Sequence, residues 1–456
     1  MYLKQVTLTN VRSFHGKRRV DLDLTRPDGS YAGWTVIAGR NGSGKTTLLR
    51  AIALAATGPD IARALVPGFE NWISSEAPGA TAKVTLAVAD AFDDTTGPAN
   101  DSRLVKAGLG WVWREPSHNR RGAGTKARQP SLRPVTGGTS LDVLRAGPWS
   151  EAPVGWFCAG YGPFRRLAGG SGEVERLMRM SGPVSRLTSL FHEDASLAEG
   201  VSWLIAQHLY ALENREGAQA LKDLALTILG DDLLPDDFHI DGVDSDGLWV
   251  VNGEHRFPLR EMSDGYRTVA ALVVDLIKQL HDAYGELTLD ASAGNPALAY
   301  PGIVMIDEVD THLHVTWQKR IGGWLTAHFP GIQFIVTTHS PYVCQAADPG
   351  GLIRLPAPDE EHPAEVVSED LYQRVVYGSG DDAVLSDLFG LDSAYSERAE
   401  EARDELVALE ADVLGGTASE TERGRYRALA QLLTSSPAAR VQEIDALLHG
   451  WDAQDS

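Results

Sequence analysis

Hydrophobic and polar residues alternate in two stretches near the N-terminus, and this period of two is typical of strands with one buried face. The apolar members are Val6 and Leu8 in the first stretch and Val20, Leu22 and Leu24 in the second. A further strand is expected at 83–90. Continuous apolar runs at 34–38, 303–306 and 332–336 instead predict parallel strands that are covered on both faces. The pattern therefore predicts an α/β fold with a mixed or parallel sheet at its core.

The remaining segments divide the chain further. Residues 91–150 are rich in Gly, Pro, Ser, Thr and Arg without sustained periodicity, whereas residues 173–230 have a helical pattern. We expect an N-terminal lobe at 1–95, a basic loop-rich insertion at 96–150 and a mainly helical insertion at 151–255. A C-terminal lobe at 256–355 and an acidic helical region at 366–456 complete the division.

Two apolar stripes near the C-terminus predict a pair of helices joined at Gly415-Gly416, an αα-hairpin. Their members are Ala399, Ala402, Leu406, Leu409 and Val413 in the first helix and Tyr426, Leu429, Leu432 and Leu433 in the second. Packing of the two helices on each other and docking of a partner protein both explain these stripes.

Composition limits the setting in which the chain works. It has 456 residues, of which 43% are hydrophobic, and no apolar run approaches the roughly 18 residues of a membrane span. We expect a soluble, cytoplasmic protein without a membrane partner. Cys158 and Cys344 form no CxxC pair, so a reduced compartment is expected and structural zinc is not.

Charge is distributed unevenly. The formal net charge is −21, and residues 341–456 carry 24 acidic residues against eight arginines and no lysine, a balance of −16. Such a segment repels a nucleic-acid backbone. The stretch 114–133 is basic instead, with five arginines, one lysine and a single glutamate. It is either a solvated surface loop or an arm that meets nucleic acid or an acidic partner.

A phosphate-binding loop follows the apolar run at 34–38 and precedes a helical pattern, which is the strand–loop–helix context of a P-loop. Its residues are Gly39, Asn41, Gly42, Ser43, Gly44, Lys45 and Thr46, followed by Thr47. Glycines let backbone N–H groups approach phosphate oxygens, and the helix N-terminus adds partial positive charge. We expect Lys45 to reach the β- and γ-phosphates of ATP and Thr46 to hold Mg²⁺.

Acidic residues end the apolar strand at 303–306. Asp307 and Glu308 match a Walker B arrangement, in which one carboxylate serves the Mg²⁺ and the next activates the attacking water. We therefore predict that Asp307 is a metal ligand and Glu308 the general base. His339 ends the strand at 332–336 at the same sheet edge, where an imidazole can hydrogen-bond the γ-phosphate.

A second phosphate-binding device is expected where Ser263 and Gly265 begin another helix. The P-loop already surrounds its own triphosphate, so the second device is expected to meet the nucleotide of a partner molecule.

Together these motifs resemble the ABC-type ATPases of the RecF/SMC/Rad50 branch. Residues 10–14 (NVRSF) and 307–314 (DEVDTHLH) resemble, more narrowly, the overcoming-lysogenization-defect and AAA_21 types, which include the ATPase subunits of Septu-like and retron-associated phage-defence systems. The motifs cover roughly residues 1–60 and 255–345. The resemblance implies nucleotide-binding roles for Arg12 and for Asp310, which stands in the position of a D-loop.

The resemblance also implies partners: a second copy of the chain in a nucleotide-sandwich dimer, or a higher oligomer, and a separately encoded effector such as a nuclease. A RecF-like DNA-repair ATPase that contacts nucleic acid is the alternative. A transporter subunit is disfavoured.

Some features depart from the family pattern. Lys45 and Ser263 are 218 positions apart, which is too short for the coiled-coil arms of SMC proteins. No Q-loop glutamine is evident near 72–80, and Met262 replaces the usual leucine of the signature. His312 and His314 are not expected to bind metal.

Overall fold

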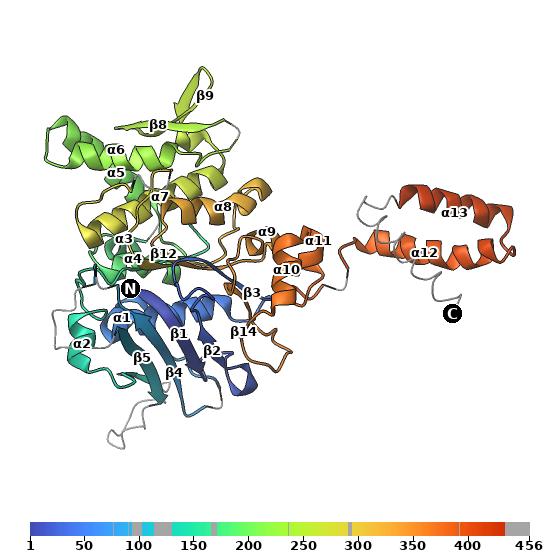
Figure 1. The fold of residues 1–456 in the computed structure, drawn as a ribbon, viewed down its shortest axis with the longest axis horizontal. Helices are drawn as coiled ribbons and strands as arrows, with labels where there is room; N and C mark the ends of the chain where they lie inside the picture. The colour runs from blue at the N-terminus through green and yellow to red at the C-terminus, as the bar shows by residue number, and fades with distance from the viewer. Residues whose placement is uncertain are drawn as a thin grey trace, which may run out of the picture. The chain divides into compact units, whose positions relative to one another are not determined.

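The structure is a computed structural model that describes residues 1–75, 77–89, 91–93, 103–113, 130–165, 171–235, 237–290, 294–391 and 393–433. The chain divides into two compact units, residues 1–390 and residues 391–456 (Figure 1). No helix in the described ranges is both long enough and apolar enough to cross a membrane.

A six-stranded sheet forms the centre of the first unit, in the order β14-β13-β3-β12-β11-β7. Its strands are β3 (Gly33–Ala38), β7 (Cys158–Tyr161), β11 (Gly302–Ile306), β12 (Ile332–Thr337), β13 (Leu352–Arg354) and β14 (Glu365–Val366). All neighbours run parallel except β14, which pairs antiparallel with β13. The register places Ile306 beside Val336 and Val336 beside Val36, so the loops after β3, β11 and β12 share one edge.

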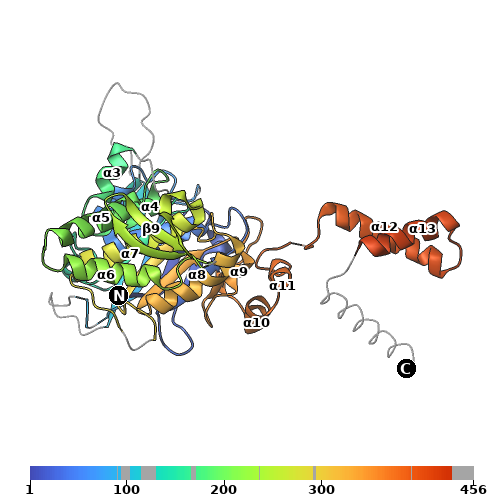
Figure 2. The same ribbon diagram turned by 90° about the horizontal axis from the view of Figure 1, so that it is seen from above.

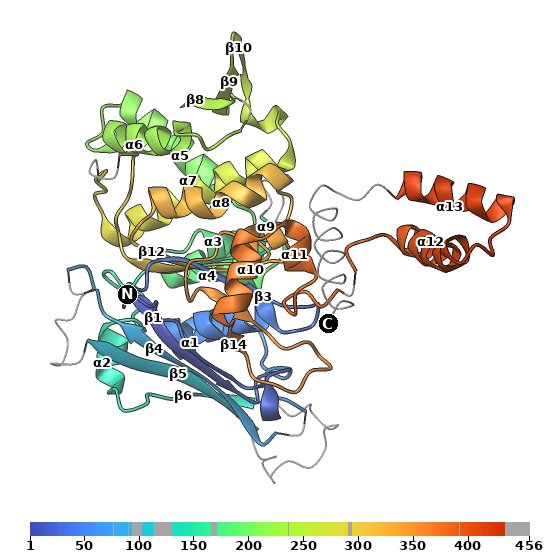
Figure 3. The ribbon, with the colours of Figure 1, turned by 45° about the vertical axis from the view of Figure 1, so that its right-hand side comes forward.

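The central strands are buried on both faces, as their continuous apolar runs predict. Val304 and Ile306 of β11 belong to a core that includes α7 (Asp264–Tyr284) and α8 (Val315–His328). Ile303 and Met305 belong to the opposite core with α1 (Lys45–Leu65). Figure 3 shows α1 on one side of the sheet and α7 and α8 on the other. Alternate residues of one strand therefore hold the two layers together.

A second, antiparallel sheet packs against α1 on its far side and has the order β2-β1-β4-β5-β6. Its strands are β1 (Tyr2–Thr9), β2 (Val20–Asp23), β4 (Gly79–Ala87), β5 (Leu104–Trp113) and β6 (Pro130–Pro134), and the short helix η1 (Gly16–Arg18) precedes β2. The alternating residues Val6, Leu8, Val20 and Leu22 are buried, as expected. The strand expected at 83–90 begins earlier and ends at Ala87.

The structure differs from the expected loop-rich insertion at 96–150. β5 pairs with β4 along its whole length, from Gly79 opposite Val112 to Ala87 opposite Leu104. β6 and the helix α2 (Leu141–Ala146) follow. Burial of Leu109 and Trp111 beneath this sheet explains the strand. The basic residues at 114–129 lie outside the described residues.

Helices follow β7, as the pattern at 173–230 predicts. They are α3 (Gly172–Met178), α4 (Pro183–Phe191), α5 (Ala198–Leu212) and α6 (Ala218–Gly230), followed by β8 (His239–Asp244), β9 (Gly247–Asn252), β10 (His255–Pro258) and η2 (Leu259–Glu261). β8, β9 and β10 form a small antiparallel sheet. In the sequence, these helices lie between β7 and α7. In the structure, α5 packs against α6 and α7 (Figure 2).

The region predicted as one C-terminal segment, 366–456, is divided between the two units. α9 (Pro341–Cys344), α10 (Glu369–Tyr377) and α11 (Gly380–Val384) belong to the first unit, where Tyr372, Val375 and Leu388 are buried in the core. The second unit contains the expected hairpin of α12 (Glu397–Leu414) and α13 (Glu420–Leu432). Arg425 Nε donates to Glu405 Oε1 at 2.7 Å between these two helices. Little apolar surface is buried in the hairpin, because α12 has no buried residue and α13 only Leu429.

Candidate functional site

The P-loop connects β3 to α1, as the sequence predicts. Gly42 and Gly44 have φ angles of 78° and 102°, in the left-handed region that favours glycine. A Cβ atom on Gly44 would also lie 2.6 Å from Phe14 Cζ. The loop can therefore keep this shape only with glycine at these positions. Asn41 and Gly42 are exposed, whereas Ser43 is fully buried.

Lys45 begins α1 and is buried beneath this loop. Its Nζ donates to the carbonyl oxygens of Gly39 at 2.7 Å and Arg40 at 3.3 Å. Burial lowers the pKa of the Lys45 ammonium, and the negative charges of Asp307 and Glu308 act in the opposite direction. The ammonium is thus held at the loop, in the field of the acidic residues that follow β11.

The Walker B residues lie beside the end of the P-loop. Thr46 Oγ1 donates to Asp307 Oδ2 at 2.7 Å, and Thr337 Oγ1 donates to Asp307 Oδ1 at 2.6 Å. The start of α1 and the ends of β11 and β12, which are far apart in the sequence, therefore meet at one carboxylate. A hydroxyl and a carboxylate oxygen side by side are hard oxygen ligands of the kind that Mg²⁺ prefers.

Glu308 has an unusual backbone conformation. Its φ is 45°, which residues with a side chain seldom adopt. Its N–H donates to Thr337 Oγ1 at 2.7 Å, and Thr311 Oγ1 donates to its Oε2 at 3.3 Å. The Glu308 side chain is therefore presented from a turn that tertiary contacts hold in place.

Asp310 and His339 are also brought together. Asp310 Oδ1 accepts from Thr338 Oγ1 at 2.5 Å and from the His339 N–H at 3.3 Å. His339 is exposed, but partial desolvation of its ring lowers its pKa, with a further contribution from the positive charge of Lys45. A neutral imidazole is accordingly favoured at this position.

Arg12 lies beside the first turn of α1. Its Nη1 donates to Thr47 Oγ1 at 3.5 Å, and its guanidinium carbon lies 4.9 Å from the centre of the Trp72 ring. Burial lowers the pKa of Arg12, and the positive charge of Arg50 acts in the same direction. The structure thus joins Arg12 to Thr47, which directly follows Thr46, one of the two proposed Mg²⁺-binding residues.

The signature residues occupy a more open surface. Ser263 is exposed and precedes α7, but its hydroxyl accepts no N–H of that helix. Serines that cap their own helices precede α2, α3, α9, α10, α11, α12 and α13: Ser140, Ser171, Ser340, Ser368, Ser379, Ser396 and Ser419. A Cβ on Gly265 would lie 2.4 Å from the His312 carbonyl oxygen, so only glycine allows this close approach.

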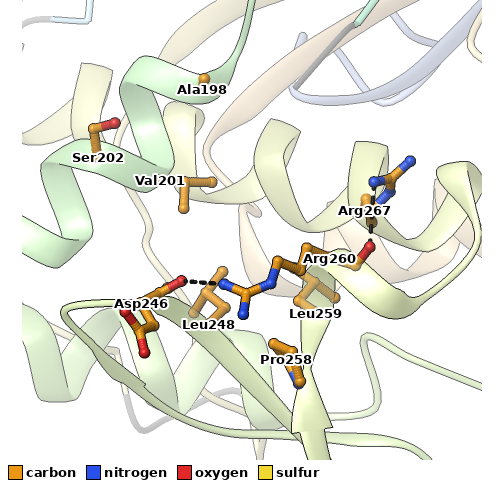
Figure 4. Close-up of a pocket in the computed structure, with 10 residues that line it drawn as sticks. Ala198, Val201, Ser202, Asp246, Leu248, Pro258, Leu259, Arg260 and Arg267 are labelled. Carbon is orange, nitrogen blue, oxygen red and sulfur yellow. Dashed lines mark hydrogen bonds between the residues drawn. The ribbon is translucent and has the colours of Figure 1, made fainter. Parts of the chain in front are cut away.

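A pocket of about 350 Å³ adjoins this signature segment (Figure 4). Its walls come from α5, the β8–β9 turn, η2 and the first turns of α7. Arg260 Nη1 donates to the Asp246 carbonyl oxygen at 3.2 Å, and Arg267 Nη1 donates to the Arg260 carbonyl oxygen at 3.3 Å. Arg267 also pairs with Asp264. The pocket wall is thereby linked to the signature by hydrogen bonds.

The paired histidines after Walker B have backbone and capping roles. His312 has a φ of 67°, and its carbonyl faces Gly265. His314 precedes α8, and its Nδ1 accepts from the Thr316 N–H at 3.4 Å.

One buried residue of the site had no role in the sequence-based prediction. Arg165 follows β7 and donates to the carbonyl oxygens of Asp307, at 3.1 Å, and Glu308, at 3.2 Å. No local sequence pattern distinguishes it from the many other arginines of the chain.

Two family models match parts of the chain. A model described as "AAA domain" matches residues 5–77, which contain the P-loop. The AAA_21 model, described as "AAA domain, putative AbiEii toxin, Type IV TA system", matches residues 199–345, which contain the signature, Walker B and His339.

Curated relatives match over parts of their length. The chain is 44% identical to "Retron Ec83 probable ATPase" of Escherichia coli over 88 residues, which are 19% of this chain and 15% of the relative. It is 29% identical to "Septu protein PtuA" of Bacillus thuringiensis over 202 residues, or 43% of this chain and 48% of the relative. The chain thus spans about half the length of these relatives or less.

Solved structures with a similar arrangement include two SMC heads. The Smc head bound to the C-winged helix domain of ScpA has 17% identity and a TM-score of 0.46, covering 80% of this chain and 98% of that chain. The SMC head domain from Thermotoga maritima has 14% identity and a TM-score of 0.41, covering 81% and 100%.

The chain's own topology and motifs define an α/β P-loop fold of the ABC type, and the predicted resemblance to AAA_21-type ATPases is confirmed. Within that class the chain is related in sequence to the retron and Septu proteins.

Proposed function

We propose that this chain binds and hydrolyses ATP, forms nucleotide-sandwich dimers and controls a separately encoded effector, such as a nuclease, in antiphage defence. The observation that carries the ATPase assignment is the meeting of Thr46, Asp307 and Thr337 at one carboxylate, directly beside the P-loop lysine. Family models and relatives named as ATPases support hydrolysis at a general level.

The P-loop N–H groups and Lys45 would bind the phosphates of ATP. Thr46 and Asp307 would hold Mg²⁺, which neutralises phosphate charge when it is bound. Glu308 would accept a proton from the attacking water, and the His339 imidazole would donate a hydrogen bond to the γ-phosphate. Arg12, Thr47 and Asp310 complete the proposed nucleotide site.

The dimer proposal rests on the open signature. Ser263 ends a loop at a helix N-terminus, yet its hydroxyl is not used for capping, and the described residues show no hydrogen bond from it to the P-loop of the same chain. A γ-phosphate bound by a second copy supplies the missing acceptor, and two-fold symmetry then gives two composite sites.

The effector proposal rests on the second unit and on the relatives. Val407, Leu414 and Leu432 of the hairpin are 65%, 80% and 71% exposed, so apolar side chains remain on its surface. Of these three, only Leu432 belongs to a predicted stripe, and the stripe of α12 is partly buried. Exposed apolar side chains on helices suit the docking of a protein helix, and the surrounding acidic charge disfavours DNA.

Hydrolysis is tested by Glu308→Gln, with Lys45→Ala as the comparison. We expect Glu308→Gln to keep ATP affinity and to lose about 10²–10⁴-fold in kcat, because an amide cannot accept the water's proton. Lys45→Ala should instead weaken binding of ATP, measured by equilibrium titration. Turnover at the wild-type rate by Glu308→Gln would exclude it as the base.

The effector role is tested by ending the chain at Gly390, the boundary of the first unit. A cut after Val366 would remove α10 and α11, whose residues are buried in the core. We expect the shorter chain to keep ATPase activity and to lose both co-purification of the neighbouring gene's product and phage protection. Loss of DNA binding alone would favour the RecF-like repair alternative.

A further inference from the structure

Arg165 lies where β7 ends, beside the Walker B strand. β7 pairs with β11 so that Tyr161 is opposite Ile306, and the Asp307 N–H donates to the Tyr161 carbonyl oxygen at 2.8 Å. The loop that follows β7 therefore lies next to the turn that follows β11. Arg165 is only 3% exposed at this position.

The Arg165 guanidinium binds backbone carbonyl groups along this turn. Its Nη1 donates to Gly162 and Asp307, each at 3.1 Å, and its Nη2 donates to Glu308, Val309 and Thr311 at 3.2, 3.2 and 3.4 Å. Four of the five acceptors thus belong to residues 307–311, the segment that contains both Walker B carboxylates.

Among the described residues, every hydrogen-bond acceptor of this cation is a backbone carbonyl oxygen and none is a carboxylate. Burial lowers the pKa of Arg165 to about 10, so the group remains charged at neutral pH. The charges of Asp310, Asp307 and Glu308 offset part of the cost of burying this cation. An apolar side chain would still fill the same space at lower cost. The need for a guanidinium therefore lies in the hydrogen bonds that it makes.

Those hydrogen bonds complete the support of Glu308. Its φ of 45° is strained for a residue with a side chain and persists only where neighbouring groups hold it. Thr337 Oγ1 accepts from the Glu308 N–H, and Arg165 donates to the Glu308 carbonyl oxygen. Both peptide groups that flank the Glu308 Cα atom are consequently fixed, and with them the direction of its side chain.

We propose that Arg165 is a positioning residue that sets the direction of the Glu308 carboxylate toward the attacking water. This inference rests on the proposed role of Glu308 as the base. A lysine keeps the charge but has a single side-chain nitrogen. It therefore cannot reproduce the contacts that Nη1 and Nη2 of the planar guanidinium make with separate carbonyl groups.

The test compares Arg165→Lys and Arg165→Gln with Arg186→Met in the full-length protein. Arg186 is a second buried arginine, 4% exposed, whose guanidinium carbon lies 5.3 Å from the centre of the Phe157 ring. We expect both Arg165 variants to lose about 10–100-fold in kcat while KM for ATP and the affinity for a fluorescent ATP analogue change less than about threefold. Arg186→Met should leave kcat within about threefold, whatever its effect on Tm.

A double-mutant cycle with Glu308→Gln separates positioning from a general structural role. If Arg165 acts through Glu308, Arg165→Lys should lower kcat by less than about threefold in the Glu308→Gln background. An unchanged kcat in Arg165→Lys and Arg165→Gln, or an equal loss in both backgrounds, would overturn the inference. Absence of ATP hydrolysis by the wild type, or an unaffected Glu308→Gln, would instead reject the proposed function.

Discussion

The two regions of this chain that we propose to contact phosphate are built in different ways. At the P-loop edge, the side chains of Lys45, Thr46 and Asp307 already have hydrogen-bond partners within the chain. At the signature, Ser263 is exposed and caps nothing. The side chains of the first region are held by contacts within the chain, whereas the second presents a serine hydroxyl for which the described residues show no hydrogen bond. This difference is expected if the P-loop edge carries out hydrolysis and the signature binds the nucleotide of a second copy of the chain.

Mixing two inactive chains tests this division most strongly. Ser263→Arg should block the signature of one copy, and Lys45→Ala should disable the P-loop of the other, so neither chain alone hydrolyses ATP. A mixture of the two should regain about one working site per dimer, because one intact P-loop then faces one intact signature. Steady-state phosphate release measures the recovery. If folded chains show no recovery at any mixing ratio, each site is completed within one chain.

Removal of the Thr337 hydroxyl tests whether hydrogen bonds within the chain hold the P-loop edge in place. Thr337 Oγ1 both donates to Asp307 and accepts from the Glu308 N–H, so Thr337→Val should leave two buried polar groups without this partner. We expect kcat to fall about 10–100-fold, which corresponds to about 1.4–2.7 kcal/mol in the barrier.

Thr188→Val is the matched control for this hydroxyl. Thr188 is fully buried as well, but its hydroxyl donates to the Val184 carbonyl oxygen within α4. Its loss should alter Tm and leave kcat within about threefold. An equal loss of kcat in both variants would mean that the hydroxyl acts through overall stability.

A buried carboxylate joins the signature helix to the catalytic sheet, and its stability effect depends on pH. Asp275 of α7 accepts from the Tyr161 hydroxyl at 2.9 Å, and burial raises its pKa. A raised pKa in the folded state favours the protonated form, so the stability from this group is present at low pH and is lost as pH rises. Asp275→Asn should therefore raise Tm at pH 7–8, with the gain shrinking toward pH 4. A pH-independent difference in Tm would contradict this account.

The smallest expected effect compares two helix caps. Ser140 accepts from the Val143 N–H at 3.2 Å at the start of α2, so Ser140→Ala should lower the free energy of unfolding by about 1 kcal/mol. Ser263→Ala should change it by less than about 0.3 kcal/mol, because Ser263 caps no N–H, yet it should weaken ATP-driven dimerisation. Chemical denaturation and analytical ultracentrifugation measure the two quantities. A stability loss of equal size at both serines would mean that Ser263 caps α7 in solution.

The sequence could predict those parts of the site that lie within a few consecutive residues. The P-loop, the Asp307-Glu308 pair and the apolar strands that carry them are local patterns, because phosphate binding needs glycines in one loop and buried parallel strands need continuous apolar runs. The amphipathic stripes of α12 and α13 likewise predict their hairpin. Assignment of roles to these residues remains a prediction.

Tertiary structure decided the features that join distant segments. The sequence analysis did not predict β5, because a glycine such as Gly108 is typical of turns. In the structure, a Cβ atom on Gly108 would lie 2.6 Å from the Ala82 carbonyl oxygen of the neighbouring strand, so glycine allows the two strands to approach closely. The contacts of Arg165 with the turn after β11 span about 140 positions. Hydrogen bonds between side chains and carbonyl groups impose no residue pattern on the acceptor, so no sequence signal records such a pairing. Only the pairing of β7 with β11 brings the arginine and the Walker B turn together.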